Sequence, residues 1–218
     1  MSSLPKRPAV HIGRSSGSAR LQVGHPIGSG KTEDMETALL VMDVQNGIVE
    51  RLADRADALL ATVADAVAAA RAAGVPVVFV RVAFRDPVVE ISARNRAFSA
   101  LAVRGGMGVD DPTTQVHPAV APRPDEAVVV KRRVSAFAGS DLDVVLRSLD
   151  ATSLVLAGLS TSGVVLSTLR AAADLDFELT VLRDACGDPD PEVHGVLMDK
   201  LFPRQADVMT TAEWIATL

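Results

Sequence analysis

Short apolar runs alternate with amphipathic stretches along most of the chain. The runs are short enough to be buried strands and lie at 38–44, 75–84, 126–131, 152–159, 177–185 and 206–210. Between them, apolar residues recur every three or four positions, as in helices, over 54–74, 140–150, 163–176 and 190–203, with shorter patches at 92–101 and at the C-terminus. This order predicts an α/β fold, a three-layer αβα arrangement around a six-stranded parallel sheet of Rossmann-like type.

The first 34 residues break this pattern. They are rich in Gly, Ser, Pro and basic residues and show no hydrophobic period. Such a composition is typical of a segment without a packed core of its own. We therefore expect a flexible N-terminal extension at 1–34 and one compact domain at 35–218.

Composition narrows the range of functions. The chain has 218 residues, of which 48% are hydrophobic, and a formal net charge of −5, so it lacks the basic surface that nucleic acids or anionic membranes attract. No apolar run is long enough to span a bilayer, and the N-terminus has no secretory signal, so we expect a cytoplasmic protein. The single cysteine, Cys186, and four histidines without ligand spacing predict neither a metal site nor a cofactor.

The carboxyl ends of the predicted strands carry the candidate chemistry. Ligands of parallel sheets bind at this edge. Asp43 and Lys131 each end an apolar run, and a lysine beside a buried carboxylate would stabilise it, so we expect the two to meet at neighbouring strand ends. The turn at 158–164 resembles a strand-to-helix corner with backbone N–H groups for an anion. Each feature also has a structural alternative: Asp43 as a structural aspartate, Lys131 as a lysine that extends to water, and the turn as an ordinary capped helix. Cys186 has no histidine nearby in the sequence, and we expect it to be a packed core residue.

Four segments together resemble the isochorismatase-like hydrolase superfamily, also called the cysteine hydrolases. They are LLVMDVQNGIV, VVVKRRVSAFAGSDL, LVLAGLSTSGVV and DVMTTAEW, in the family's order and spacing over about 37–214. The resemblance implies an isochorismatase-type sheet, a homo-oligomer (dimer or tetramer) and a catalytic set of Asp, Lys and Cys. Asp43 and Lys131 match the first two, whereas Val164 stands at the usual cysteine position. The resemblance also implies a cis peptide at Leu159–Ser160.

Valine has neither a lone pair nor a proton, so covalent catalysis at position 164 is excluded. Isochorismatases proper also lack this cysteine and hydrolyse a vinyl ether. The first hypothesis follows from them: Asp43 is the general acid, and Lys131 positions the substrate and screens charge. Residues expected to bind the small-molecule substrate are Arg81 or Arg85, for a carboxylate, together with Gln45, Phe137, Ser160 and Ser162.

Two further hypotheses stay open. In the second, an amide or similar C–N bond is hydrolysed by water that Asp43 activates, or by Ser160 or Ser162 in place of the thiol. In the third, the chain is a catalytically silent scaffold that binds a small molecule. Ser160 and Ser162 also depart from true isochorismatases, which usually carry an aromatic residue and a histidine in this turn. A nicotinamidase is not expected, since VAFRDPVVE lacks the metal-binding histidine.

Overall fold

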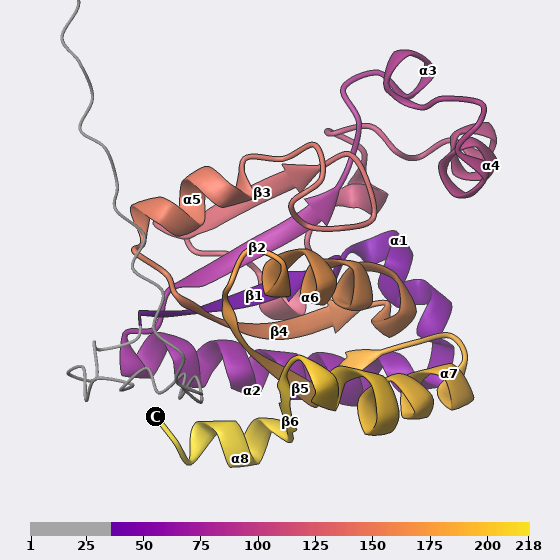
Figure 1. Ribbon diagram of the computed structural model, residues 1–218. Coiled ribbons are helices and arrows are strands. Elements are labelled where there is room, and N and C mark those ends of the chain that lie inside the picture. Colours follow the sequence, from indigo (N-terminus) through magenta and orange to yellow (C-terminus); the bar gives the residue numbers. More distant parts are fainter. Residues whose placement is uncertain (1–35) are drawn as a thin grey trace, which may run out of the picture. The chain divides into compact units, whose positions relative to one another are not determined.

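A six-stranded parallel sheet forms the centre of the structure, a computed structural model that describes residues 36–218, apart from the side chains of residues 87, 88 and 104 (Figure 1). The strand order is β3-β2-β1-β4-β5-β6, and neighbouring strands pair in parallel. The strands are β1 (Thr37–Met42), β2 (Val77–Val82), β3 (Ala127–Lys131), β4 (Ser153–Leu159), β5 (Glu178–Gly187) and β6 (Asp207–Met209). This confirms the predicted fold class, while the predicted extension at 1–34 lies outside the described residues.

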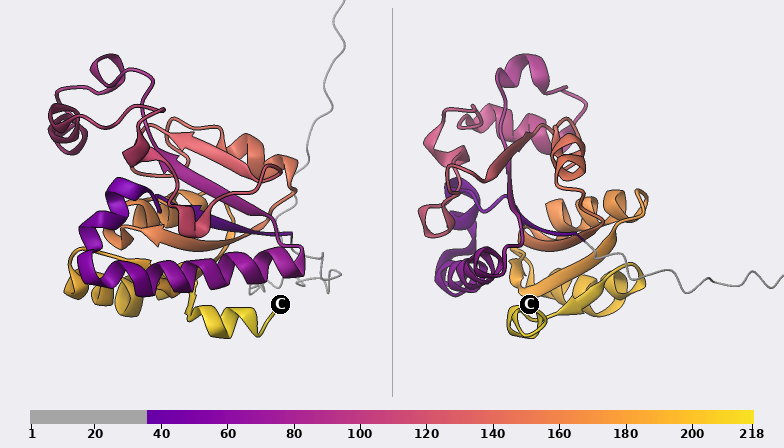
Figure 2. Two further views of the ribbon diagram at one scale, coloured as in Figure 1. Left: turned by 180° about the vertical axis from the view of Figure 1, so that it is seen from behind. Right: turned by 90° about the vertical axis from the view of Figure 1, so that its left-hand side faces the viewer.

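Helices cover both faces of the sheet (Figure 2). The α-helices are α1 (Asn46–Val49), α2 (Ala56–Ala73), α3 (Pro87–Glu90), α4 (Arg96–Arg104), α5 (Leu142–Ser148), α6 (Leu166–Ala173), α7 (Pro191–Val196) and α8 (Thr211–Ile215). The shorter turns are the 3-10 helices η1 (Glu50–Arg55), η2 (Pro112–Thr114), η3 (Pro118–Val120) and η6 (Phe202–Arg204), and the π-helices η4 (Thr161–Val165) and η5 (Leu197–Leu201). Among the described residues, no helix has the length and apolar character needed to cross a membrane.

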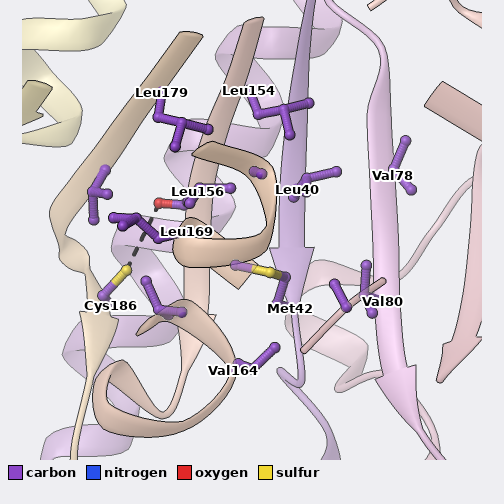
Figure 3. Close-up of a cluster of buried hydrophobic side chains, with 14 of the residues drawn as sticks. Leu40, Met42, Val78, Val80, Leu154, Leu156, Val164, Leu169, Leu179 and Cys186 are labelled. Carbon is purple, nitrogen blue, oxygen red and sulfur yellow. Dashed lines mark hydrogen bonds between the residues drawn. The ribbon is translucent and has the colours of Figure 1, made fainter. Parts of the chain in front are cut away.

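The central strand β1 divides the core into two halves. Alternate side chains of a strand point to opposite faces, so Leu40 and Met42 pack on the side of α5 and α6, whereas Leu39 and Val41 pack on the side of α2 and α8. Figure 3 shows the first half, where Leu40 and Met42 lie near Val164. Both faces of β1 are therefore buried, which explains why this strand is a continuous apolar run.

The segments that connect the strands are the part of the structure that differs most from the sequence prediction. Residues 46–55 form α1 and η1, which were not predicted, because each is too short to show a helical period. The predicted helix at 163–176 begins as the π-turn η4 before α6, and the predicted helix at 190–203 consists of α7, η5 and η6 in succession. The helical patch predicted at 92–101 is α4, which lies with α3 beyond the carboxyl ends of the strands (Figure 1).

The contact between Gly158 and Met42 should be the steric constraint that fixes β4 against β1. Gly158 pairs with Met42, has a φ of 140°, and a Cβ at this position would overlap the Met42 carbonyl oxygen. We predict that Gly158→Ala lowers the free energy of unfolding by about 3 kcal/mol or more, because the backbone of β1 cannot move away within a packed sheet. Urea unfolding followed by circular dichroism measures this loss.

Gly74→Ala is the matched control. Gly74 also has a positive φ, 75°, but a Cβ there meets nothing within 4 Å. Gly74→Ala should lower the free energy of unfolding by about 1–2 kcal/mol, because it adds only the strain of a left-handed backbone. Equal losses for the two variants would contradict the proposed clash between the strands.

Candidate active site

Asp43 and Lys131 form a buried ion pair at the carboxyl edge of the sheet. Asp43 directly follows β1 with a φ of 55°, a left-handed conformation that aspartate tolerates better than most residues. Lys131 is the last residue of β3, and its Nζ lies 2.8 Å from Asp43 Oδ2. The expected meeting therefore occurs, but not between neighbouring strands: β2 lies between β1 and β3, and the lysine side chain spans it.

All three donors of the Lys131 ammonium group have acceptors within the protein. Besides Asp43, its Nζ donates to the carbonyl oxygens of Arg133 and Val134, each at 3.0 Å. An ammonium group has three N–H donors. Lys131 is thus placed to hold Asp43 rather than to donate a further hydrogen bond to a ligand.

One oxygen of Asp43 remains without a partner. Oδ2 accepts from Lys131, whereas Oδ1 is buried and makes no hydrogen bond in the structure. Burial raises the pKa of the Asp43 carboxyl above its ordinary value and outweighs the opposing effect of the Lys131 charge. The free oxygen belongs to a side chain that lines a cavity, so it is available to a substrate or a water molecule.

This cavity, called here the inner cavity, has a volume of about 210 Å³. Its walls are mainly apolar, with Asp43 and Lys131 among a few polar groups. The lining residues are Asp43, Ile48, Arg51, Leu52, Val82, Ala97, Phe98, Leu101, Lys131, Val134, Leu159, Ser160, Gly163, Val164, Gly187 and Pro189. An apolar wall of this kind explains why burial dominates the pKa of Asp43.

Four residues of the strand-to-helix turn line the inner cavity, namely Leu159, Ser160, Gly163 and Val164. Ser160 and Val164 both line it, and the peptide bond between Leu159 and Ser160 is cis, as the resemblance implies. Val164 is only 2% exposed and also packs into the core beside Met42 (Figure 3). The turn therefore presents a hydroxyl and an isopropyl group near the ion pair.

Gln45 and Arg81 were expected to bind substrate but lie outside the inner cavity. The Gln45 amide donates to the carbonyl oxygens of Val82 and Thr114, at 3.0 and 2.7 Å, and accepts from the Val82 N–H. Arg81 donates to the carbonyl oxygens of Val109 and Thr114. Both side chains instead fasten the 105–116 loop to the end of β2.

Three other predicted binding residues also lie elsewhere. Arg85 is exposed and pairs with Glu90, with 2.7 Å between Arg85 Nη2 and Glu90 Oε1. The Phe137 ring packs 6.2 Å from that of Phe177. Ser162 is exposed, and its backbone N–H donates to the Asp188 carboxylate at 2.8 Å. None of the three lines the inner cavity, because their partners hold them on other parts of the domain.

The cavity wall formed by α1, η1 and α4 was not predicted from the sequence. Arg51 and Leu52 come from η1, whereas Phe98 and Leu101 come from α4. The three-residue spacing of Phe98 and Leu101 was the available signal, since it places both on one face of a helix. Arg51 gave no signal, because its segment shows no period.

Cys186 packs in the core and does not line the inner cavity. Its Sγ lies 3.7 Å from the Leu156 carbonyl oxygen (Figure 3), and burial raises the pKa of the thiol to about 12. A thiol with this pKa is not ionised near neutral pH and is therefore a poor nucleophile. Among residues 36–218, no group of three His, Cys, Asp or Glu side chains is placed to hold a metal ion.

Comparison with known proteins agrees with this fold. Residues 37–213 match the isochorismatase domain, so the chain belongs to the isochorismatase family and is a hydrolase of that family. The family includes cysteine hydrolases, to which the chain is structurally similar: it aligns with the cysteine hydrolase of Pseudomonas syringae pv. phaseolicola 1448A at a TM-score of 0.75 and 25% identity, over 83% of this chain and 91% of that one.

Two relatives found by sequence comparison are identical to this chain to about the same degree. The isochorismatase family protein YecD of Escherichia coli O157:H7 is 31% identical over 84% of this chain and 96% of its own length. The ureidoacrylate amidohydrolase RutB of Pseudomonas syringae pv. syringae is 32% identical over 72% of this chain and 73% of its own length.

The ion pair should contribute to stability in a pH-dependent manner. Lys131→Met removes the ammonium group and leaves the buried Asp43 carboxylate uncompensated, so we predict a loss of about 3 kcal/mol in the free energy of unfolding near pH 8. Because burial raises the pKa of Asp43 in the folded state, protonation at lower pH removes the uncompensated charge, and the loss should shrink near pH 5. Urea unfolding at both pH values measures it.

Lys200→Met is the control for loss of a lysine at an exposed position. It should change stability by less than about 0.5 kcal/mol at either pH. A Lys131→Met loss that is the same at both pH values would contradict a charged, buried carboxylate as its cause.

Proposed function

We propose that this isochorismatase-family hydrolase cleaves a vinyl ether by acid catalysis from Asp43, without a covalent enzyme intermediate. The observation that carries the proposal is the buried, unpartnered Oδ1 of Asp43, on a side chain that lines the inner cavity and has a raised pKa. A general acid needs a proton at the operating pH and access to the reacting atom. The raised pKa supports the first requirement, and the position of Asp43 on the cavity wall supports the second.

The reaction begins with transfer of the Asp43 proton to the terminal alkene carbon of the substrate. The ether-bearing carbon becomes oxocarbenium-like, and water adds to it while the Asp43 carboxylate takes up one proton of that water. The resulting hemiketal collapses: its C–O bond to the leaving group breaks, and its hydroxyl proton passes to the leaving oxygen. One water is consumed, a ketone and an alcohol are released, and Asp43 regains its proton.

Lys131 acts in this scheme as a positioning residue. Its bond to Oδ2 fixes the carboxyl group so that the other oxygen carries the reactive proton. The nearby positive charge also stabilises the carboxylate that forms when the proton leaves. Val164, which the sequence resemblance aligns with the usual cysteine position, lines the cavity without offering a nucleophile.

Asp43→Asn should abolish turnover while leaving substrate binding in place. The amide has nearly the shape of the carboxyl group but cannot deliver a proton as a general acid, and such a loss typically lowers kcat by about 10²–10⁴-fold. A screen of small vinyl ethers such as isochorismate, followed by release of the ketone, measures turnover in the natural protein and in the variant. Full activity in Asp43→Asn would end the proposal.

The pH profile of kcat separates an acid from a base. A general acid is active when protonated, so kcat should fall as the pH rises through the pKa of Asp43. An Asp43 that activates water as a base would instead lose activity as the pH falls through the same pKa. A decline only on the acidic side would therefore contradict the acid role while keeping Asp43 catalytic.

Hydrolysis of an amide or similar C–N bond is the second candidate, and the similarity to a ureidoacrylate amidohydrolase favours it. In this scheme, water attacks the carbonyl carbon with Asp43 as its base, or Ser160 replaces the missing thiol from the cavity wall. Ser162 fits this role poorly, since it does not line the inner cavity.

Val164→Cys tests whether an amide-type pocket persists. If it does, the new thiol beside Asp43 should raise hydrolysis of small amides at least tenfold above that of the natural protein, in an ammonia-release assay. Val165→Cys is the matched control, because Val165 is buried in the same turn but does not line the inner cavity. No gain for Val164→Cys over this control would count against the second candidate.

A further inference from the structure

Arg51 is a cation of the inner cavity that has no partner in the described part of the chain. It is exposed, belongs to η1, and makes no hydrogen bond or ion pair through its side chain with any residue of 36–218. The other cation of the cavity, Lys131, has acceptors for all three donors. Arg51 is therefore free to bind an anionic ligand.

Four other arginines have partners within the described residues. Arg55, Arg81 and Arg133 donate to backbone carbonyl oxygens, and Arg85 pairs with Glu90. None of these four lines the inner cavity. Recognition of a carboxylate by Arg81 or Arg85, which the sequence suggested, is thus less compatible with the structure than recognition by Arg51.

The backbone that carries Arg51 is anchored by the residues that follow it. Leu52, the next residue, is buried and lines the inner cavity, while Arg55 donates to the carbonyl oxygens of Asp188 and Pro189. Ala53 lies between them with a φ of 49°, so the chain turns sharply there. The guanidinium group therefore extends from a fixed position, which lowers the entropy lost when it binds a ligand.

A second cavity adjoins the inner cavity at Arg51. This outer cavity has a volume of about 340 Å³ and shares four lining residues with the inner one, namely Ile48, Arg51, Val82 and Leu101. A ligand with its reacting end at Asp43 thus passes Arg51 before it reaches the outer cavity. Any charged group on such a ligand meets the guanidinium group on the way.

The charges of the inner cavity favour an anion. Asp43, Lys131 and Arg51 are the ionisable residues of its lining, and their net charge is +1 with Asp43 ionised and +2 with Asp43 protonated, as the proposed acid mechanism requires. Glu50 lines the outer cavity only, so it disfavours an anion there and not beside Asp43. The apolar remainder of the wall suits a compact hydrocarbon body between the two polar ends.

We propose that Arg51 binds a carboxylate of the substrate where the two cavities adjoin, and so restricts the enzyme to small organic acids whose scissile bond reaches Asp43. Arginine suits this role because its planar fork of N–H donors matches the two oxygens of a carboxylate. The inference rests on the proposed function for the position of the scissile bond, and it adds the residue that selects the substrate class.

Two matched probe pairs test the charge preference: pyruvate against pyruvamide, and succinamate against succinamide. Within each pair the heavy-atom count is the same and only one negative charge differs. Binding is measured by calorimetry on full-length protein carrying Asp43→Asn, so that turnover does not interfere. At least one acid should bind about tenfold more tightly than its amide, the effect of one charge-assisted contact.

The preference should disappear when Arg51→Gln is added and return in part with Arg51→Lys. Adding Arg147→Gln instead should preserve it, because Arg147 is an exposed arginine of α5 that pairs with Asp143. Lack of preference for either acid, or a preference that survives Arg51→Gln, overturns the inference. Since this readout needs no turnover, failure of the acid mechanism is seen separately, as activity retained by Asp43→Asn.

Discussion

A carboxylate held in an apolar cavity by one ammonium group is the interaction on which the rest of this site depends. Burial of either charge alone is unfavourable, and the pair is stable only when the two groups meet at hydrogen-bond distance. Asp43 and Lys131 meet this condition from strands that are not adjacent, across the end of β2. The alignment of three strand ends is therefore a requirement of the chemistry as well as of the fold.

The tight pairing of β1 with β4 also positions the turn that lines the inner cavity. Gly158 lets β4 approach β1 at Met42, one residue before Asp43. The chain that follows Gly158 then places Ser160 and Val164 on the cavity wall. The position of the turn relative to the carboxylate is thus set by backbone packing, which no side chain of the cavity needs to enforce.

The sequence predicted the features that are encoded locally. The apolar runs located all six strands, and Asp43 and Lys131 stood out because each ends such a run. Gln45 and Arg81 were assigned to substrate because their partners, carbonyl oxygens of the 105–116 loop, are distant in sequence. Arg51 was overlooked since its role depends on a short kinked segment that has no periodic signal.

The apolar surroundings of Asp43 favour its role as an acid. Val164 adds an apolar side chain to a wall already formed by residues such as Phe98 and Leu159, and an apolar wall favours the protonated form of Asp43. The charge of Lys131 lowers the pKa of Asp43, but the ammonium group also donates to two carbonyl oxygens. Its effect on this pKa does not outweigh that of burial. The raised pKa of Asp43 and the aliphatic side chain at position 164 are thus two features of one apolar cavity, and the proposed reaction, which starts with protonation of carbon, uses both.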